Sequence, residues 1–319
     1  MKVAVTGASG FVGGHLLQHL CARDIAVNAV LRRRDVALPS GANAFPGVDL
    51  LEAFDCSDAL RGCDAVIHLA ARVHVMQDTS VDPLAAYRQG NTAATLRLAE
   101  QAAAAGVRRF VFLSSIKVNG EETQPGQPFT TGSVPQPRDA YGISKLEAEQ
   151  GLREIADRSD MQIVLIRTPL VYGPGVRANF RSMMHWLRRG IPLPFRSLRD
   201  NRRSLTAVGN LVDAIARALT APAAANQLLL VADGEDLSTA ELLVRLGAAL
   251  GHPARLVPMP PGLLALAARA AGLGGLRQRL LGSLQVDASS ARRVLDWTPP
   301  LSVDAGLQLT ADDYLRHLS

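Results

Sequence analysis

Short apolar runs alternate along the chain with longer segments of helical pattern. The runs cover residues 3–6, 25–31, 65–69, 110–114 and 163–167. Between them, segments such as residues 92–105 and 140–156 have the length and composition of helices. Strands that alternate with helices in this way predict a parallel, doubly wound α/β sheet.

The alternation stops after Arg167, at Thr168-Pro169-Leu170-Val171-Tyr172-Gly173-Pro174-Gly175. A stretch this rich in proline and glycine cannot continue regular structure, so we expect the chain to leave the sheet here. Residues 210–219 and the strand-like 227–231 are expected to return to it. The sequence therefore predicts a first domain over residues 1–169 plus about 206–235. A smaller, discontinuous lobe is predicted over about 170–205 and 236–319.

Composition and charge narrow the class of protein. With 319 residues, 48% hydrophobic and 20% charged, the chain has the balance of an ordinary globular protein. Its net charge of +5 comes from basic residues scattered among acids, with one tight run at Arg32-Arg33-Arg34. Because nucleic-acid binding needs clustered basic residues, we expect no nucleic-acid partner. Lysine occurs only at positions 2, 117 and 145, a bias towards arginine that we attribute to codon composition.

Cysteine spacing and hydropathy give expectations about location. Cys21, Cys56 and Cys63 show no CxxC spacing and no nearby histidine cluster, so we expect neither a disulfide framework nor a metal site. Residues 1–5 are already strand-like, without a secretory leader, which predicts a cytoplasmic protein. The most apolar stretch, residues 263–276, is too short to cross a bilayer and contains Arg269. We expect a buried helix there and no membrane insertion.

A glycine loop follows the first predicted strand. Thr6-Gly7-Ala8-Ser9-Gly10-Phe11-Val12-Gly13 has the spacing GxxGxxG and leads into the first predicted helix. Glycine allows the backbone to turn sharply and to approach a pyrophosphate, and free N–H groups at the helix start bind phosphate oxygens. The loop predicts a dinucleotide site.

The second predicted strand ends in Val30-Leu31-Arg32-Arg33-Arg34, where NAD-binding proteins carry an acid that accepts the ribose hydroxyls. Arginines there suit the 2′-phosphate of NADP. We therefore expect NADP(H) to be preferred, with Arg32 and Arg33 as contacts. NAD(H) stays possible, because Asp35 could take the place of the missing acid.

Residues 64–71 predict a buried strand that ends in small residues, so that a flat cofactor can lie against Ala70 and Ala71. His68 and His74 are candidate acid/base groups, although a hydrogen-bonded structural role is favoured for both. Asp49 and Leu50 could bracket an adenine or form a surface loop.

The candidate catalytic residues lie further along the chain. Ser114 and Ser115 end the 110–114 run, at the sheet edge where ligands bind in such folds. Tyr141 and Lys145 are four residues apart and therefore share one helix face. The ammonium can stabilise the phenolate of a tyrosine whose ordinary pKa is about 10, while a serine hydroxyl holds the substrate oxygen. This arrangement predicts hydride transfer with a nicotinamide.

These motifs, together with His68-Leu69-Ala70-Ala71, Asn91-Thr92 and Phe112-Leu113-Ser114-Ser115, resemble the extended short-chain dehydrogenase/reductase family over essentially the whole chain. The resemblance implies a Rossmann-type fold with Ser115, Tyr141 and Lys145 catalytic, and Lys145 also on the nicotinamide ribose. It implies cofactor contacts at Gly7, Ser9, Gly10, Phe11, Val12, Gly13, Asp49, Leu50, Leu69, Ala70, Ala71, Asn91, Ser114, Tyr141, Lys145 and Pro169. It also implies a homodimer through the helices that bear Asn91 and Tyr141.

The substrate follows from the same resemblance. The segment 172–180 resembles the family's nucleotide-sugar segment, which gives Asn179 a diphosphate contact, and Arg203 and Arg279 match phosphate-binding positions. Residues 114–121 and 202–205 are similar to the branch that handles UDP-hexosamines in bacterial surface-polysaccharide synthesis. Ile116 and Lys117 stand where a dehydratase has acids, so dehydration ranks low.

Two reactions remain for a UDP-sugar. The arginines after the second strand favour a 4-ketoreductase of a UDP-4-keto-6-deoxy-hexosamine, which consumes NADPH. The alternative is a UDP-sugar 4-epimerase, which returns its hydride. A third class, a dinucleotide-sensing protein without turnover, commonly lacks the tyrosine or the lysine that this chain retains.

Overall fold

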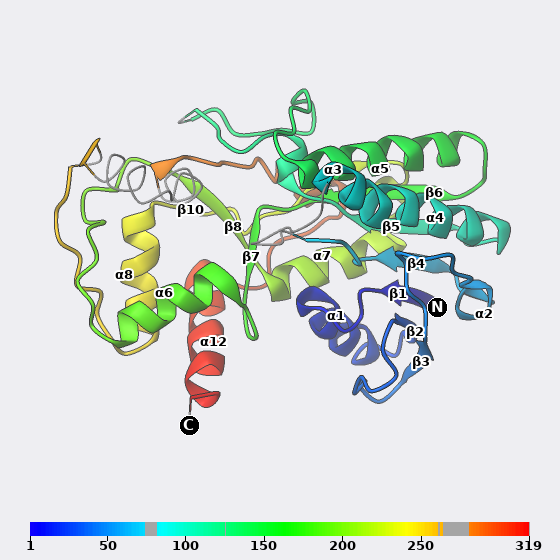
Figure 1. Ribbon diagram of the computed structural model, residues 1–319, viewed down its shortest axis with the longest axis horizontal. Helices are drawn as coiled ribbons and strands as arrows, with labels where there is room; N and C mark the ends of the chain where they lie inside the picture. Colours follow the sequence, from blue (N-terminus) through cyan, green and yellow to red (C-terminus); the bar gives the residue numbers. More distant parts are fainter. Residues whose placement is uncertain (74–81, 125, 261, 264–280, 319) are drawn as a thin grey trace.

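A parallel sheet forms the centre of the molecule (Figure 1). The computed structural model describes residues 1–73, 82–124, 126–260, 262–263 and 281–318. The seven strands lie in the order β3-β2-β1-β4-β5-β6-β9, and every neighbouring pair is parallel. Their bounds are β1 Lys2–Thr6, β2 Ala26–Leu31, β3 Ala42–Pro46, β4 Ala65–His68, β5 Arg109–Leu113, β6 Gln162–Arg167 and β9 Leu228–Leu230. The predicted Rossmann-type sheet is confirmed.

Helices cover both faces of this sheet. One core is shared by α1 (Phe11–Cys21), α7 (Val208–Thr220) and α11 (Ser289–Val294), and the other by α2 (Ser57–Leu60), α4 (Ala94–Ala104) and α5 (Ala140–Asp157). In β1, Val3 and Val5 enter the first core and Ala4 the second. Because both faces are buried, the central strands are mostly apolar, which explains why they stand out in the sequence.

A second, three-stranded sheet has the order β10-β8-β7. It consists of β7 (Leu170–Tyr172), β8 (Arg203–Ala207) and β10 (Asp236–Leu237). Its strands share a third core with α6 (Ala178–Arg188), α8 (Thr239–Ala249) and α12 (Val303–Arg316), which lie on the left in Figure 1. The remaining short helices are α3 Pro83–Tyr87, the π-helix η1 Arg88–Ala93, and the 3-10 turns η2 Ile116–Val118 and η3 Pro222–Ala224.

The structure corrects the expectation that residues 168–175 contain no regular structure. Leu170–Tyr172 forms β7, which pairs in parallel with β8. Pro169 precedes the strand, where no ladder N–H is required of it, and Gly173 follows with a φ of +151°. Pairing with a distant strand therefore decides the conformation of these three residues. The return of the chain to the central sheet through α7 and β9 is confirmed.

Two further elements differ from the expected pattern. The edge strand β3 was not expected, because its mostly exposed residues lack a clear apolar pattern. The helix expected from residue 92 begins earlier, since α3 and the π-helix η1 lead into α4. π-Helical turns often occur at functional sites, and this one carries Asn91.

Two candidate regions fall partly or wholly beyond the described ranges. Leu263 is exposed, and the rest of the apolar stretch 264–276 lies outside the described residues. His74 and Arg279 also lie outside them. Within the helices that the structure describes, none combines the length and apolar character needed to cross a bilayer.

Candidate active site

The glycine loop connects β1 to α1 and packs tightly against the end of β4. Gly7 has a φ of +69°, and a Cβ there would lie 2.6 Å from the Ala70 nitrogen. At Gly13 a Cβ would lie 2.1 Å from the Gly7 oxygen. Both positions therefore require glycine. Gly10 caps α1 without a side chain, so the N–H groups of the first turn are available to a phosphate.

Ser9, Phe11 and Val12, which the sequence predicted as cofactor contacts, lie in the loop and at the start of α1. Ser9 is exposed, and Phe11 stacks edge-on against His15 at 5.7 Å. The His15 ring bonds the Pro174 oxygen at 2.8 Å, which ties α1 to the segment after β7. Val12 packs on the first core. The first turn of α1 is thus fixed from both sides.

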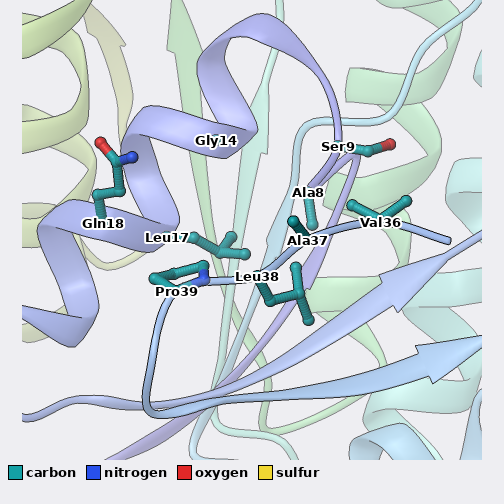
Figure 2. A pocket seen from close by; sticks show the side chains of 9 residues that line it. All are labelled: Ala8, Ser9, Gly14, Leu17, Gln18, Val36, Ala37, Leu38 and Pro39. Atoms are coloured by element: carbon teal, nitrogen blue, oxygen red, sulfur yellow. The ribbon is translucent and has the colours of Figure 1, made fainter.

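The three arginines after β2 are all exposed. The Arg33 guanidinium donates two hydrogen bonds to the Asp35 carboxylate, at 2.9 and 2.6 Å. A pocket of about 380 Å³ lies between α1 and residues 36–39, which follow these arginines in the chain (Figure 2). Its lining residues are Ala8, Ser9, Gly14, Leu17, Gln18, Val36, Ala37, Leu38 and Pro39. None of these is charged, so the arginines lie outside this pocket and Arg33 already has an anionic partner.

The ends of β3 and β4 carry the next candidates. The Asp49 carboxylate accepts from the Leu51 N–H at 3.0 Å, which fixes the turn that contains Leu50. Leu69, Ala70 and Ala71 are half-buried where β4 ends. The backbone of Leu69 and Ala70 packs directly against Gly7.

Asn91 is 1% exposed and joins three elements. Its Oδ1 accepts from the Arg72 N–H at 2.7 Å. Its Nδ2 donates to the Arg72 oxygen at 3.1 Å and to the Ser144 hydroxyl at 3.0 Å. The amide therefore holds the chain after β4 against α5.

His68 has the structural role that the sequence favoured. It is fully buried, and its ring nitrogens lie 2.5 Å from the Thr6 hydroxyl and 2.9 Å from the Thr95 hydroxyl. The ring stacks on Phe112 at 5.7 Å. Burial lowers the pKa of His68 to about 3, so the ring is neutral near pH 7.

The structure brings Ser115, Tyr141 and Lys145 together at the carboxyl edge of the sheet. Ser115 follows β5, and its Oγ accepts from the Lys117 N–H at 3.3 Å. Tyr141 lies in the first turn of α5 and is hydrogen-bonded to Ser115. Lys145, one turn further on, donates from Nζ to the Leu113 oxygen at 2.9 Å. The strand end that carries Ser115 is thus joined to the helix that carries Tyr141 and Lys145.

Burial shifts both titratable members of this group. It raises the pKa of Tyr141 to about 12, against the effect of the Ser115 hydrogen bond. It lowers the pKa of Lys145 to about 7, against the opposite effect of Glu149. A lysine that exchanges its proton near neutrality can assist proton transfer by the tyrosine.

Behind this group lies a buried network. The Ser114 hydroxyl donates to Glu149 at 2.5 Å, and the Arg167 guanidinium donates to the two carboxylate oxygens of Glu149 at 2.9 and 2.5 Å. Arg167 also donates to Asn119 Oδ1 at 2.9 Å. The Glu149 and Arg167 side chains are 2% and 3% exposed, so their charges compensate each other away from water. Ser114 thus faces this network.

The substrate-side candidates lie on the second sheet and its helices. Asn179 is exposed in the first turn of α6, directly after Ala178, which has a φ of +52°. Arg203 begins β8 and donates to the Gly282 oxygen at 3.0 Å. Pro169 lies between β6 and β7, at the exit from the central sheet.

Sequence reasoning missed Glu149 and Asp139. Glu149 lies four residues after Lys145 and eight after Tyr141, so helical spacing could have placed it on the same face. Asp139 is the N-cap of α5, where an aspartate before a helical pattern is a recognisable signal. Tyr87, whose ring is 6.2 Å from that of Tyr141, gave no local signal.

Neither a disulfide nor a cluster of metal ligands occurs among the described residues. Cys21, Cys56 and Cys63 are all unpaired. Burial raises the pKa of the Cys56 thiol to about 12, so it is unreactive. In the described part of the chain, no three His, Cys, Asp or Glu side chains are grouped to hold a metal ion.

Comparison with known proteins identifies the class. Residues 3–232 match the model of the NAD dependent epimerase/dehydratase family. The chain belongs to this family, and the expected membership of the extended short-chain dehydrogenase/reductases is confirmed. It is an NAD(P)-dependent enzyme of that type.

A curated relative and two solved structures are similar to the chain over essentially its whole length. The chain is 43% identical over 315 residues to a UDP-glucose 4-epimerase of Vibrio cholerae, covering 99% of this chain and 96% of the relative. The structure of MoeE5 in complex with UDP-glucose and NAD is 27% identical, with a TM-score of 0.76 and full coverage of both chains. The UDP-glucuronic acid 4-epimerase of Bacillus cereus, at 22% identity, a TM-score of 0.80 and full coverage of both chains, shows the same fold.

Proposed function

We propose that the chain is a UDP-sugar 4-epimerase with Ser115, Tyr141 and Lys145 as its catalytic residues. The observation that carries this proposal is the grouping of these side chains at the carboxyl edge of the sheet, the same edge at which the glycine loop follows β1. The Vibrio cholerae relative, identical at 43% of positions, supports a UDP-hexose as substrate. That relative is a 4-epimerase, which supports a reaction at C4 of the sugar.

In this proposal Tyr141 moves the proton. Its phenolate takes the proton from the C4 hydroxyl of the sugar, and its phenol returns one after the keto intermediate has turned over. Ser115 donates a hydrogen bond to the same oxygen, and the Lys145 ammonium stabilises the phenolate. A bound nicotinamide supplies the hydride chemistry at C4.

The residues at the glycine loop fit such a cofactor. Gly7 and Gly13 allow a turn that no side chain could occupy, and the start of α1 offers its N–H groups. We propose that these groups hold the pyrophosphate. We place the rest of the dinucleotide along Ser9, Phe11, Val12, Asp49, Leu50, Leu69, Ala70, Ala71, Asn91, Ser114 and Pro169, with Lys145 at the nicotinamide ribose.

NADP preference stays a proposal. Arg32 is exposed where a 2′-phosphate could reach it, whereas Arg33 would have to exchange Asp35 for the phosphate. MoeE5 was solved with NAD, which supports NAD as the second possibility. Titration of the purified protein with both dinucleotides decides the matter, since NAD binding at least as tight as NADP would exclude the preference.

A 4-ketoreductase of a UDP-4-keto-6-deoxy-hexosamine is the second candidate. The arginines after β2 favour it, because net reduction consumes a freely exchanging NADPH. In that case Tyr141 protonates the C4 oxygen as the hydride arrives. A role in surface-polysaccharide synthesis and a cytoplasmic location remain predictions from the sequence.

The absorbance of reduced nicotinamide separates the two reactions. Purified protein is incubated with a panel of UDP-sugars together with NAD or NADP, and with UDP-4-keto sugars together with NADH or NADPH. Interconversion of C4 epimers with no net change in the absorbance of reduced nicotinamide is expected for the epimerase. Stoichiometric loss of NADPH with a 4-keto sugar would instead establish the reductase and reject the epimerase.

We propose that the second sheet and its helices bind the nucleotide sugar, with Asn179 and Arg203 on the diphosphate and Arg279 as a further contact. This assigns about residues 170–205 and 236–319 to substrate binding. In the structure, however, α11 packs on the core of the central sheet. Loss of substrate affinity in Arg203→Met, with cofactor affinity retained, is the expected result.

We also propose a homodimer through the helices bearing Asn91 and Tyr141. The η1–α4 segment and α5 lie side by side on one face of the sheet (Figure 1). They are linked by Asn91 to Ser144 at 3.0 Å and by Arg88 to Glu147 at 2.6 Å. Light scattering after size-exclusion chromatography tests this, and a monomer at micromolar concentration would reject it.

A further inference from the structure

Lys117 links the loop that carries Ser115 to the helix that carries Tyr141. Its backbone N–H donates to Ser115 Oγ at 3.3 Å. Its ammonium forms an ion pair with the Asp139 carboxylate and lies 3.4 Å from Glu121. One residue therefore contacts the serine through its backbone and the start of the tyrosine helix through its side chain.

The loop and the helix are also in close backbone contact. Asp139 caps α5, since its Oδ1 accepts from the Gly142 N–H at 2.7 Å. A Cβ on Gly142 would lie 2.8 Å from the Lys117 oxygen and 3.2 Å from Asp139 Oδ1. Tyr141, between these two positions, is thus placed by the same residues that hold Lys117.

We propose that Lys117 is a positioning residue that holds Ser115 against Tyr141 and neutralises the carboxylate of Asp139 beside the tyrosine. The inference rests on the proposed function, in which Tyr141 transfers the proton. It goes beyond that function because Lys117 contacts neither the reacting oxygen nor the cofactor in the proposed reaction. Lys117 acts through its two neighbours.

Charge explains why the pairing matters. The titratable groups described around Tyr141 are Tyr87 from α3, Asp139 before α5 and Lys145 on α5. Burial is the main cause that raises the pKa of Tyr141, and the charge of Asp139, the anionic member of this set, raises it further. The Lys117 ammonium opposes this effect of Asp139, because its positive charge offsets the carboxylate charge that disfavours the Tyr141 phenolate.

The residue type fits this role. Lysine occurs at three positions in the chain, whereas arginine provides the other basic residues. The Lys117, Asp139 and Glu121 side chains are 31%, 28% and 23% exposed. A compact ammonium with three donors can contact two carboxylates in such a half-buried space, whereas a planar guanidinium needs more room.

The test uses the full-length protein and four variants. Lys117→Met removes the ammonium, Asp139→Asn removes the carboxylate but keeps a good helix cap, and the double variant removes both. Arg158→Met is the matched control, because Arg158 pairs with Glu100 on the surface at 3.0 Å. Circular dichroism and thermal melting verify that each variant is folded.

We expect Lys117→Met to shift the limb of the kcat profile that reports loss of the Tyr141 proton towards alkaline pH, by about half a unit to one unit. At neutral pH, kcat then falls by roughly 3-fold to 10-fold. KM for the UDP-sugar changes little. The double variant returns towards the wild-type profile, and Arg158→Met does not shift it.

An unshifted limb in folded Lys117→Met, or a double variant that stays as displaced as Lys117→Met, would overturn the inference. A substrate-free measurement keeps it distinct from the proposed function. Alkaline titration of tyrosinate absorbance, taken against the matching Tyr141→Phe protein, must show a higher ionisation pH in Lys117→Met. If wild type turned over no UDP-sugar, the proposed function would fail, while this titration would still decide the role of Lys117.

Discussion

The side-chain nitrogen of Lys145 donates a hydrogen bond to the backbone oxygen of Leu113 at 2.9 Å. The lysine of the tyrosine helix is therefore anchored to the last residue of β5, directly before the two serines. Its ammonium also lies 4.3 Å from the centre of the Phe112 ring. Because the side chain is 1% exposed, its charge is held without contact with water.

This burial makes stability depend on pH. The pKa of Lys145 falls from 10.5 in the unfolded chain to about 7 in the fold. Between these values the unfolded state binds more protons, so the free energy of unfolding rises with pH. Relative to Lys145→Met, wild type should gain up to about 1.4 kcal/mol per pH unit in this window. Urea unfolding of both proteins at several pH values measures the slope. Parallel dependence on pH would contradict the prediction.

His68 gives the corresponding effect at acid pH. Its pKa is 6.5 in the unfolded chain and about 3 in the fold, so stability is lost as the pH falls below 6.5. We expect wild type to lose up to about 1.4 kcal/mol per pH unit more than His68→Gln there. Acid titration of unfolding free energy is the measurement. The exposed His252 provides a control, and His252→Gln should keep the wild-type slope.

Glu149 should be required for stability because it pairs with Arg167 inside the protein. Glu149→Gln leaves the buried guanidinium without its countercharge and should cost about 3 kcal/mol. The matched control is Glu100→Gln, which breaks an exposed pair with Arg158 and should cost less than about 1 kcal/mol. Both are measured by denaturant unfolding. Equal losses in the two variants would refute the distinction.

Tyr141→Phe tests the proposed acid/base group. Removing the hydroxyl should lower kcat at least about 100-fold, because in the proposed reaction this hydroxyl transfers the proton to and from the C4 oxygen. Dinucleotide affinity, measured by calorimetry, should change little. Arg158→Met, which breaks the exposed pair with Glu100, should retain activity. Unchanged turnover in Tyr141→Phe would exclude Tyr141 as the proton-transferring group.

Much of the fold could be predicted because central strands are apolar on both faces. The glycine loop could also be predicted, because Gly7 and Gly13 are close in sequence as well as in space. The strand β7 could not be predicted, because residues 170–172 become a strand only when they pair with β8. The structural role of His68 could be favoured from the sequence, but its partners Thr6 and Thr95 could not be named, because they lie on other elements.

By itself, the sequence determined the helix face shared by Tyr141 and Lys145 and the loop that precedes α1, because both depend on spacings of a few residues. Only the tertiary structure decided that Ser114 faces a buried Glu149–Arg167 pair and that Lys117 joins Ser115 to Asp139. These contacts join segments 18 to 35 residues apart. Their formation depends on which strands are neighbours in the sheet, a property that local periodicity does not encode.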